Sequence, residues 1–427
     1  MSNPIRIGIA GLGTVGAGLI KIIQKNSNIL EARAGKPIKI IAVSALSKSK
    51  DRGVDLTAYE WEDDPIALAK RDDIDVFVEL IGGESGQAKK ATEEAIKHGK
   101  HVVTANKAML AIHGQELASA AENSGVNLRF EAAVAGGIPV IKTLTESLAG
   151  NNITRIMGVM NGTCNYILTR MEDTGLAYEE IFEEANQLGF LEADPNLDVG
   201  GIDAAHKLVL LSSIAYGTQV DFNGAILEGI GRITIEDIKA ASEMGYRIKL
   251  LGVSSLSDSG LSQTMRPCLV PLTSPLAQLN GGTNMIIIEG DAVGQIVLRG
   301  AGAGEGPTAS AVIADILDIA RGINIPVFGQ PANSLIKVPA ISTSVENSFY
   351  LRLNLKDEAG ILAKVSAALA NVGISIDRIR QEGHEKDAAP VIIVTHPTDR
   401  DTLNKAISEI EETSAAIDPP VVLRIES

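Results

Sequence analysis

One lysine follows a group of acids at the start of an apolar segment. In GFLEADPNLDVGGIDAAHKLVLLSS, residues 189–213, Lys207 comes after Glu192, Asp194, Asp198 and Asp203. If a helix opens at Asp203, Asp203 and Lys207 are four residues apart and share one face. The surrounding helix positions are apolar, which indicates burial. A buried lysine among carboxylates is a candidate for proton transfer or substrate binding, although a structural ion pair would have the same pattern.

A glycine motif near the N-terminus predicts a dinucleotide site. The apolar run IRIGIA at 5–10 indicates a strand, GLGTVG follows at 11–16, and the next residues have helical spacing. In this context Gly11 permits a tight turn, Gly13 lets a pyrophosphate approach the helix start, and Gly16 lets helix and strand pack closely. The predicted cofactor-binding turn comprises Gly11, Leu12, Gly13, Thr14, Val15 and Gly16.

The segment after the second predicted strand favours NADP over NAD. In NAD-binding domains an acid at this place holds the ribose 2′-hydroxyl. Here the segment reads VSALSKSK and has no carboxylate until Asp51. Its polar residues Ser44, Ser47, Lys48 and Lys50 can instead contact a 2′-phosphate. NAD stays an alternative, because loop lysines are often simply solvated.

Two further residues, Lys107 and Cys164, are candidates for the active site because of their positions in the sequence. Lys107 follows the strand-like HVVTAN, at the strand end where ligands of parallel sheets collect, although a surface lysine at a helix start fits equally well. Cys164, in MNGTCNYIL, could be a nucleophile, but its position inside a predicted helix favours a small packed side chain. The six histidines show no ligand spacing, so we expect no transition-metal site.

The elements around these residues indicate an α/β protein. Strand-like segments at 39–45, 75–82, 101–106 and 127–134 alternate with helical ones near 64–71, 86–98 and 113–124. This alternation predicts a Rossmann-like, doubly wound parallel sheet. A glycine loop and helix at 301–322 are expected to return to this first domain.

The rest of the chain predicts an α+β domain followed by a ferredoxin-like tail. Longer helices are expected at 163–175, 178–189, from Asp203, and at 234–252, with strands between 250 and 300. Residues 323–347 contain three prolines and resemble a linker. From residue 348 the order of the expected elements is β-α-β-β-α-β, which is the order of a ferredoxin-like fold.

Composition favours a globular protein with small-molecule partners. The 427 residues suggest two to four domains, with 45% hydrophobic and 21% charged residues. A formal net charge of −15 argues against nucleic-acid partners. We expect no secretory signal and no membrane span. The two cysteines, far apart, favour a reducing compartment, and we expect a cytoplasmic location.

Seven motifs together resemble homoserine dehydrogenase with a C-terminal ACT domain. They are GLGTVG, TANKA, FEAAVAGGIPVI, MNGTCNYIL, GFLEADP, GIDAAHKL and GAGxxPTASAVIAD, in the family's order over essentially the whole chain. The resemblance implies NAD(P)H-dependent reduction of L-aspartate 4-semialdehyde to L-homoserine, toward threonine, methionine and isoleucine. It also implies an NAD(P)-binding domain at 1–137 completed by 305–322, a catalytic and dimerisation domain at 138–322, a linker at 323–347 and an ACT regulatory domain at 348–427.

The resemblance also implies roles for individual residues. Lys207 would be the proton donor/acceptor, and Lys107 would contact both cofactor and substrate. Gly189, Glu192 and Asp203 would bind the substrate, and Gly304 would join the cofactor site. Main-chain oxygens of Glu131, Val134, Gly136 and Ile138 would bind a monovalent cation, usually sodium. A homodimer or homotetramer is expected, and Asp194 and Asp198 have no assigned role.

The tail motif DEAGILAKVSAALANVGISI resembles an ACT domain, which implies a small amino-acid effector. Gly360 fits the first strand-to-helix turn, where such domains bind their ligand, and we hypothesise feedback inhibition by L-threonine. The chain departs from the family twice. Ala359 stands where many relatives have proline, and Ala45 stands where NADP-preferring relatives often have arginine.

Two other functions fit parts of the sequence. An acylating semialdehyde dehydrogenase would need a cysteine thiolate, and Cys164 is the plausible candidate. A regulator that senses nucleotide and amino acid would combine an inert dinucleotide domain with an ACT module. That second alternative leaves Glu192, Asp203 and Lys207 without a purpose, and no basic face for DNA is evident.

Overall fold

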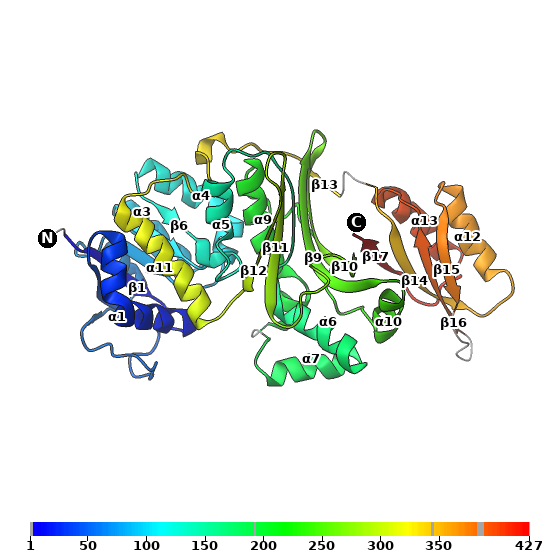
Figure 1. Cartoon of the computed structure of the whole chain (residues 1–427), viewed down its shortest axis with the longest axis horizontal. Coiled ribbons are helices and arrows are strands. Elements are labelled where there is room, and N and C mark those ends of the chain that lie inside the picture. The colour runs from blue at the N-terminus through cyan, green and yellow to red at the C-terminus, as the bar shows by residue number, and fades with distance from the viewer. Residues whose placement is uncertain (1–2, 192–193, 343–345, 382–387, 427) are drawn as a thin grey trace. The chain divides into compact units, whose positions relative to one another are not determined.

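The chain forms two compact units, each assembled from separate segments of the sequence. The computed structural model describes residues 3–191, 194–342, 346–381 and 388–426, and Figure 1 labels their elements. The first unit contains Met1–Met160, Asp203–Asn223 and Thr283–Val338. The second contains Asn161–Ile202, Gly224–Gly282 and Pro339–Ser427. The segment that begins at Asp203 therefore belongs to the first compact unit.

The first unit contains the predicted doubly wound sheet. Its strands are β1 (Ile5–Ala10), β2 (Ile38–Ser44), β3 (Glu60–Trp61), β4 (Val76–Glu79), β5 (His101–Thr104) and β6 (Leu128–Arg129). They lie in the order β3-β2-β1-β4-β5-β6, and all neighbours are parallel. The order reverses at β1, so the strand ends beside β1 and β4 are the expected ligand site.

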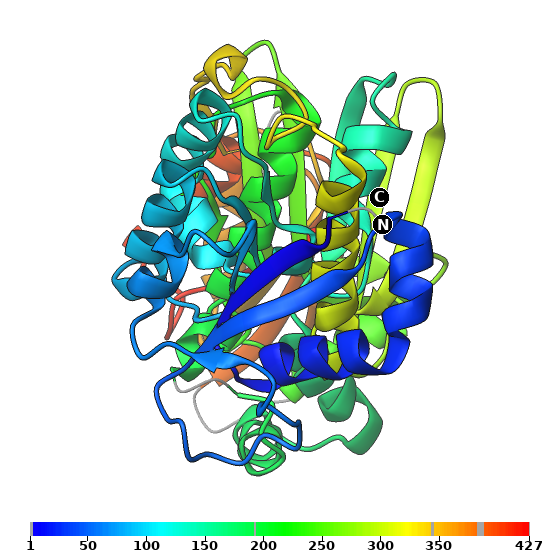
Figure 2. The same cartoon turned by 90° about the vertical axis from the view of Figure 1, so that its left-hand side faces the viewer.

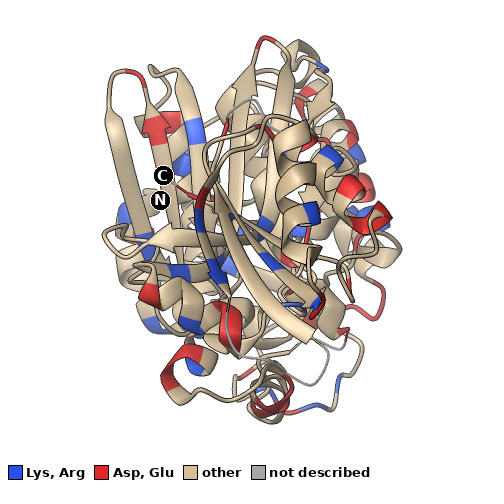
Figure 3. Cartoon of the chain, turned by 90° about the vertical axis from the view of Figure 1, so that its right-hand side faces the viewer, with Lys and Arg blue, Asp and Glu red and all other residues tan. Residues whose placement is uncertain are grey.

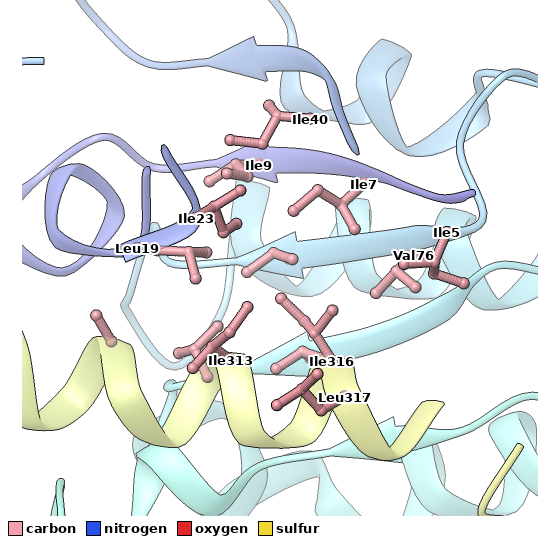
Figure 4. Packing of buried hydrophobic residues seen from close by; sticks show 14 of the residues in the cluster. Ile5, Ile7, Ile9, Leu19, Ile23, Ile40, Val76, Ile313, Ile316 and Leu317 are labelled. Atoms are coloured by element: carbon pink, nitrogen blue, oxygen red, sulfur yellow. The ribbon is translucent and has the colours of Figure 1, made fainter. Parts of the chain in front are cut away.

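Helices connect and cover these strands. They are α1 (Thr14–Ala34), α2 (Pro65–Lys70), α3 (Gln87–Lys97), α4 (Lys107–Asn123) and α11 (Glu305–Arg321). As predicted, α11 returns to this domain, and Figure 2 shows it, in yellow, beside the blue α1. Figure 4 shows the apolar core between them, in which Ile7 and Ile9 of β1 lie near Ile313 and Ile316 of α11. All but Ile313 among these four are fully buried.

The remaining elements of the first unit carry the candidate site. They are η1 (Glu131–Ala133), α5 (Val140–Lys142), η2 (Thr143–Ser147), β7 (Ile153–Val159), α9 (Ile202–Tyr216), β11 (Thr283–Gly290), β12 (Gly294–Ala301) and η3 (Ala332–Ser334). Strand β11 pairs antiparallel with both β7 and β12. Helix α9 is buried along most of its length, as its apolar sequence predicts.

The second unit joins helices and a sheet to the C-terminal domain. Its first elements are α6 (Gly162–Thr174), α7 (Tyr178–Gln187), α8 (Pro195–Val199), β8 (Ile226–Leu227), α10 (Ile235–Glu243), β9 (Tyr246–Ser257), β10 (Gly260–Pro271) and β13 (Ala340–Ile341). The long strands β9 and β10 form an antiparallel pair.

The C-terminal elements confirm the predicted β-α-β-β-α-β order. They are β14 (Phe349–Lys356), α12 (Ile361–Asn371), β15 (Ile376–Gln381), β16 (Ala388–Thr395), α13 (Arg400–Glu412) and β17 (Val421–Ile425). The strands lie in the ferredoxin-like order β17-β14-β16-β15. Strand β17 also pairs in parallel with β10, through Cys268 with Arg424 and Leu269 with Ile425. The sheet of this domain therefore continues into β10.

Three predicted segments differ from the structure at their ends. Helix α4 begins at Lys107, six residues before the predicted 113–124, because the side chain of Asn106 caps it by accepting from the Met109 N–H at 3.1 Å. The predicted helix 234–252 ends at Glu243, and its remainder belongs to β9 because Gly245 turns the chain with φ 86°. The predicted strand 127–134 is only Leu128–Arg129, followed by η1. Among the described helices, none is long and apolar enough to cross a membrane.

Candidate active site

A single carboxylate holds both candidate lysines. The ammonium Nζ of Lys207 donates to Oδ2 of Asp203 at 2.7 Å, as expected for residues four apart on α9. The other oxygen, Oδ1, lies 2.8 Å from Nζ of Lys107, which stands at the first position of α4. The structure therefore brings together three residues that the sequence places almost 100 positions apart. Sequence spacing indicated the Asp203–Lys207 pair but not the contact with Lys107.

Lys207 has a second acceptor in the main chain. Its Nζ donates to the carbonyl oxygen of Met160 at 2.8 Å, and the side-chain amide of Asn284 donates to the same oxygen at 3.1 Å. An ammonium has three N–H donors. Within the described residues Lys207 uses two of them, which leaves one for a bound ligand. Asn284 had no signal in the sequence, because it contacts the lysine only through a shared carbonyl.

The charges at this site determine which groups can exchange protons. Burial alone would raise the pKa of Asp203, but the ammonium groups of Lys207 and Lys107 outweigh it and hold this pKa well below its usual value. Asp203 is therefore a carboxylate at neutral pH. Burial lowers the pKa of the neighbouring His206 to about 4, and its ring packs on Phe222 with centroids 4.5 Å apart. His206 is therefore neutral at pH 7, and it is a packed side chain rather than an acid.

The glycine turn has the geometry that a dinucleotide needs. Gly11 has φ 99°, and a Cβ there would lie 2.2 Å from the carbonyl oxygen of Leu80. Gly13 is exposed and has open space beside it, at the N-terminus of α1 where no side chain caps the helix. Thr14 and Val15 form the first turn of α1, whose free N–H groups suit a pyrophosphate.

A cleft of about 540 Å³ extends from this turn to the end of β2. Its lining includes Gly11, Leu12, Gly13, Ser44, Ser47, Lys50 and Arg52. Arg52 was not predicted from the sequence, because it lies just beyond the segment VSALSKSK. Its guanidinium donates to the carbonyl oxygens of Leu12 at 3.0 Å and Lys50 at 2.7 Å, which links the glycine turn to the 44–52 loop. Lys48 lies instead over the ring of Trp61, 5.9 Å from its centroid.

The predicted cation segment is buried and turns sharply. Ala135 and Gly136 have φ 57° and 53°, and a Cβ on Gly136 would lie 2.5 Å from the carbonyl oxygen of Gly302. Gly304, in the same loop as Gly302, opens α11. The carbonyl oxygens of Glu131 and Ile138 accept from Val134 and Val140 N–H groups at 3.3 and 2.8 Å.

The carbonyls of Val134 and Gly136 make the segment suitable for a cation. Both residues are buried, and neither oxygen accepts a hydrogen bond among the residues that the structure describes. Buried carbonyls rarely stay unpaired, so this is a suitable main-chain ligand set. Among the described residues, no group of three or more His, Cys, Asp or Glu side chains could hold a metal ion.

The other candidates lie in the second unit. Gly189 follows α7 with φ 74°, and Glu192 lies outside the described residues, so the substrate-binding roles of both stay predictions. Asp194 caps α8 by accepting from the Asn196 N–H at 3.1 Å, which is a structural role. Asp198 is buried and accepts from the side-chain amide of Asn161 at 2.9 Å.

Cys164 is a packed residue, as the helical pattern favoured. It is fully buried on α6, and its thiol donates to the carbonyl oxygen of Asp198 at 3.2 Å. A thiolate nucleophile needs access and a nearby positive charge. The burial of Cys164 therefore gives no support to the acylating alternative.

Comparisons with known protein families match three parts of the chain. The sequence model described as "Homoserine dehydrogenase, NAD binding domain" matches residues 11–131. The model "Homoserine dehydrogenase" matches residues 139–317, and the ACT domain model matches residues 349–414. Together they span the glycine turn, the lysines and the ferredoxin-like tail.

Relatives that match the full length of the chain are also homoserine dehydrogenases. A homoserine dehydrogenase of Neisseria gonorrhoeae is 42% identical over 100% of this chain and 99% of that protein. Among solved structures, a homoserine dehydrogenase of Thiobacillus denitrificans has a TM-score of 0.93 and 39% identity, covering 100% and 99% of the two chains. A hyperthermophilic archaeal homoserine dehydrogenase in complex with NADPH has a TM-score of 0.64 and 26% identity, covering 74% of this chain and 97% of that one.

Replacing Asp203 tests whether it neutralises the two lysines. We expect Asp203→Asn to lower the free energy of unfolding by about 3–5 kcal/mol, because removing one partner leaves buried charge uncompensated. Urea denaturation at pH 7 measures this. The matched control is Glu93→Gln, which breaks the half-exposed pair of Lys89 and Glu93 at the same spacing and should cost under about 1 kcal/mol. Equal losses in the two variants would contradict the prediction.

Proposed function

The chain belongs to the homoserine dehydrogenase family and is an NAD(P)-dependent oxidoreductase, and from this premise we propose that Lys207 is the proton donor/acceptor of its reaction. The proposed reaction is reduction of L-aspartate 4-semialdehyde to L-homoserine, in the formation of threonine, methionine and isoleucine. The observation that carries the proposal is the buried ammonium of Lys207. Asp203 and the Met160 carbonyl hold it in place, and among the described residues one of its N–H groups has no acceptor.

The chemistry of the reaction fits a lysine in this setting. The bound nicotinamide supplies a hydride to the aldehyde carbon, so negative charge develops on the aldehyde oxygen. The free N–H of Lys207 can donate to this oxygen and then transfer its proton there. Asp203 keeps Lys207 in position through their ion pair. Lys107 adds a second positive charge on the other side of Asp203.

We propose that Asp203, Glu192 and Gly189 bind the amino-acid part of the substrate. A carboxylate offers about four lone-pair positions, so Asp203 can accept from a substrate ammonium as well as from Lys107 and Lys207. A charge-assisted hydrogen bond of this kind is stronger than one between neutral groups. Binding of L-homoserine to an Asp203→Asn variant, measured by calorimetry, should be weaker than to the native chain, and equal affinity would contradict this role.

Assays of L-homoserine oxidation with NADP and with NAD test the reaction and the lysine separately. We expect activity in the native chain and a fall of at least about 100-fold in kcat for Lys207→Met, because the proton donor is lost. The matched control is Lys100→Met, since Lys100 is about as buried in the same unit, at 8% exposure against 7% for Lys207. Cys164→Ser should also stay active.

The outcomes of this assay are distinct. An inactive native chain with either cofactor would contradict the proposed reaction. A rate in Lys207→Met close to that of Lys100→Met would contradict the proton-transfer role and leave the reaction standing. Loss of activity in Cys164→Ser, with folding preserved, would favour the acylating alternative.

We propose NADP as the preferred cofactor. The cleft beside the glycine turn is lined by Ser44, Ser47, Lys50 and Arg52, which suit a 2′-phosphate. Arg52 already donates to main-chain carbonyls, so its main part is to hold the loop, and Lys50 is the more available charge. The NADPH complex of the archaeal relative is consistent with this preference.

Lys50→Ala tests the cofactor preference. We expect kcat/KM for NADP to fall about tenfold, because one charge-assisted contact to the phosphate is lost, while kcat/KM for NAD stays unchanged. The control is Lys25→Ala, an exposed residue of α1 away from the cleft. Equal changes in kcat/KM for NADP and NAD would show that Lys50 does not contact the 2′-phosphate.

We propose a sodium ion at the main-chain oxygens of Glu131, Val134, Gly136 and Ile138. The buried carbonyls of Val134 and Gly136 without donors among the described residues support this. The segment packs on the loop that leads to Gly304 at the start of α11. Replacing sodium by choline in the same assay buffer should lower the rate, and an unchanged rate would contradict a sodium requirement.

We propose further that the chain divides into a cofactor domain at 1–137 with 305–322, a catalytic and dimerisation domain at 138–322, a linker at 323–347 and a regulatory domain at 348–427. Both cysteines are buried thiols, which supports a reducing compartment, and we propose the cytoplasm. A homodimer or homotetramer is proposed from the family, and sedimentation equilibrium would distinguish these from a monomer.

The ACT domain is the proposed site of L-threonine inhibition. Gly360 opens α12 after β14 with φ 88°, at the turn where such domains are expected to bind an amino acid. We expect Gly360→Ala to weaken inhibition by L-threonine at least about tenfold, because a Cβ is strained at this φ and displaces the turn. The measurement is the threonine dependence of the oxidation rate.

Gly373→Ala is the matched control for this substitution. Gly373 follows α12 with φ 81° and also has open space around it, so both variants carry the same backbone strain. Inhibition that stays native in Gly360→Ala, or that falls equally in both variants, would contradict the proposed site.

A further inference from the structure

Three arginines from three elements converge beside the junction of β10 and β17. Arg266 belongs to β10, Arg424 to β17, and Arg400 is the first residue of α13. The strand register pairs Cys268 with Arg424, and Arg266 lies two residues before Cys268. Side chains two apart on a strand share a face, so Arg266 and Arg424 project from the same side of the sheet. Figure 3 shows the Lys and Arg positions of the chain in blue.

The charges around this cluster do not balance. Burial, together with the nearby charges of Arg266 and Arg424, lowers the pKa of Arg400 to about 10. The acids that face the cluster are Glu228 and Glu426, and Glu426 lies 2.8 Å from Nη2 of Arg424. Three guanidinium groups thus meet two carboxylates among the described residues. The remaining positive charge is in a place where water screens it poorly.

Some of the arginine donors have no acceptor. Within the described part of the chain, the buried Nε atoms of Arg266 and Arg424 make no hydrogen bond. The side chain of Arg424 is only 14% exposed. A buried donor left unpaired costs about 1–3 kcal/mol, and more when it is charged. Arg400, by contrast, lies over the ring of Phe349 at 5.8 Å, which fixes its guanidinium on one side.

A small cavity lies between these groups. Its volume is about 20 Å³, and Arg266, Arg400 and Arg424 line it together with Thr264, Ser342 and Asn347. A space of at least about 10–15 Å³ holds one water-sized particle, so an amino acid or a phosphate does not fit. A water molecule would satisfy the N–H donors but would leave the excess positive charge, whereas a single-atom anion satisfies both.

We propose that this cavity is a binding site for one halide ion, chloride under physiological conditions, held by Arg266, Arg400 and Arg424. The ion would join β10 to strand β17 and helix α13 of the C-terminal domain. The site is separate from the turn at Gly360, because its lining comes from other elements. Its occupancy should therefore stabilise the attachment of that domain to β10.

Thermal unfolding of the full chain tests this site. Chloride is titrated against gluconate at constant sodium concentration and ionic strength, so that general salt effects and any sodium requirement stay fixed. We expect a saturable rise in Tm of at least about 2 °C in the native chain, by mass action. Arg400→Gln should lose the rise. The matched control is Arg247→Gln, an arginine of β9 that pairs with Glu172 and should keep it.

A second measurement does not depend on how well the variants fold. Crystals of the native chain grown in bromide should show one anomalous peak between the guanidinium groups of Arg266, Arg400 and Arg424. Absence of this peak, with density for water in its place, would overturn the proposal. A native chain whose Tm does not respond to chloride, or a rise that is equal in Arg400→Gln and Arg247→Gln, would overturn it as well.

Discussion

The carboxylate of Asp203 is the interaction on which the candidate active site depends. It is buried, yet it is ionised because Lys207 and Lys107 each contact one of its oxygens. Removing a charge from water is costly unless a partner of this kind pairs with it. The fold supplies this arrangement by setting the first turn of α9 against the first turn of α4. The position of each ammonium is therefore fixed before any ligand binds, which is what transition-state stabilisation requires.

The parallel sheet explains why these residues can meet a nicotinamide cofactor. Gly11 and Gly13 follow β1, and Lys107 follows β5, so all three lie at the same edge of one sheet. Ligands of doubly wound sheets bind at this edge because the strand order reverses beside β1. Helix α11 covers one side of the core, and Gly304 lies at its start. Helix α11, although it comes late in the sequence, thus packs in the same domain as the N-terminal glycine turn.

Local patterns in the sequence predicted most of the fold but not all of the site. The alternation of apolar strands and helices determined the sheet, and the spacing of Asp203 and Lys207 determined their contact, because both depend on short-range periodicity. The contact of Lys107 with Asp203 depends on tertiary packing, as do Asn284 and Arg52, so no local pattern indicated them. The helix boundary at Asn106 was missed because a side-chain cap, rather than apolar spacing, sets it. Continuation of the C-terminal sheet into β10 likewise has no local signature.

The same electrostatic constraint applies to buried positive charge at two places in this chain. Around Asp203, two ammonium groups share one carboxylate, and around Arg424, three guanidinium groups meet two described carboxylates. In both, the positive groups outnumber by one the described carboxylates that interact with their charges, and a low-dielectric site makes an excess of positive charge costly. An excess of this kind is tolerated where an anionic group completes the site. Beside Lys207 that group is proposed to be the oxygen that becomes negative during hydride transfer, so the charge contributes to catalysis. Beside Arg424 it is proposed to be a permanent halide, so the same imbalance contributes to attachment of a domain.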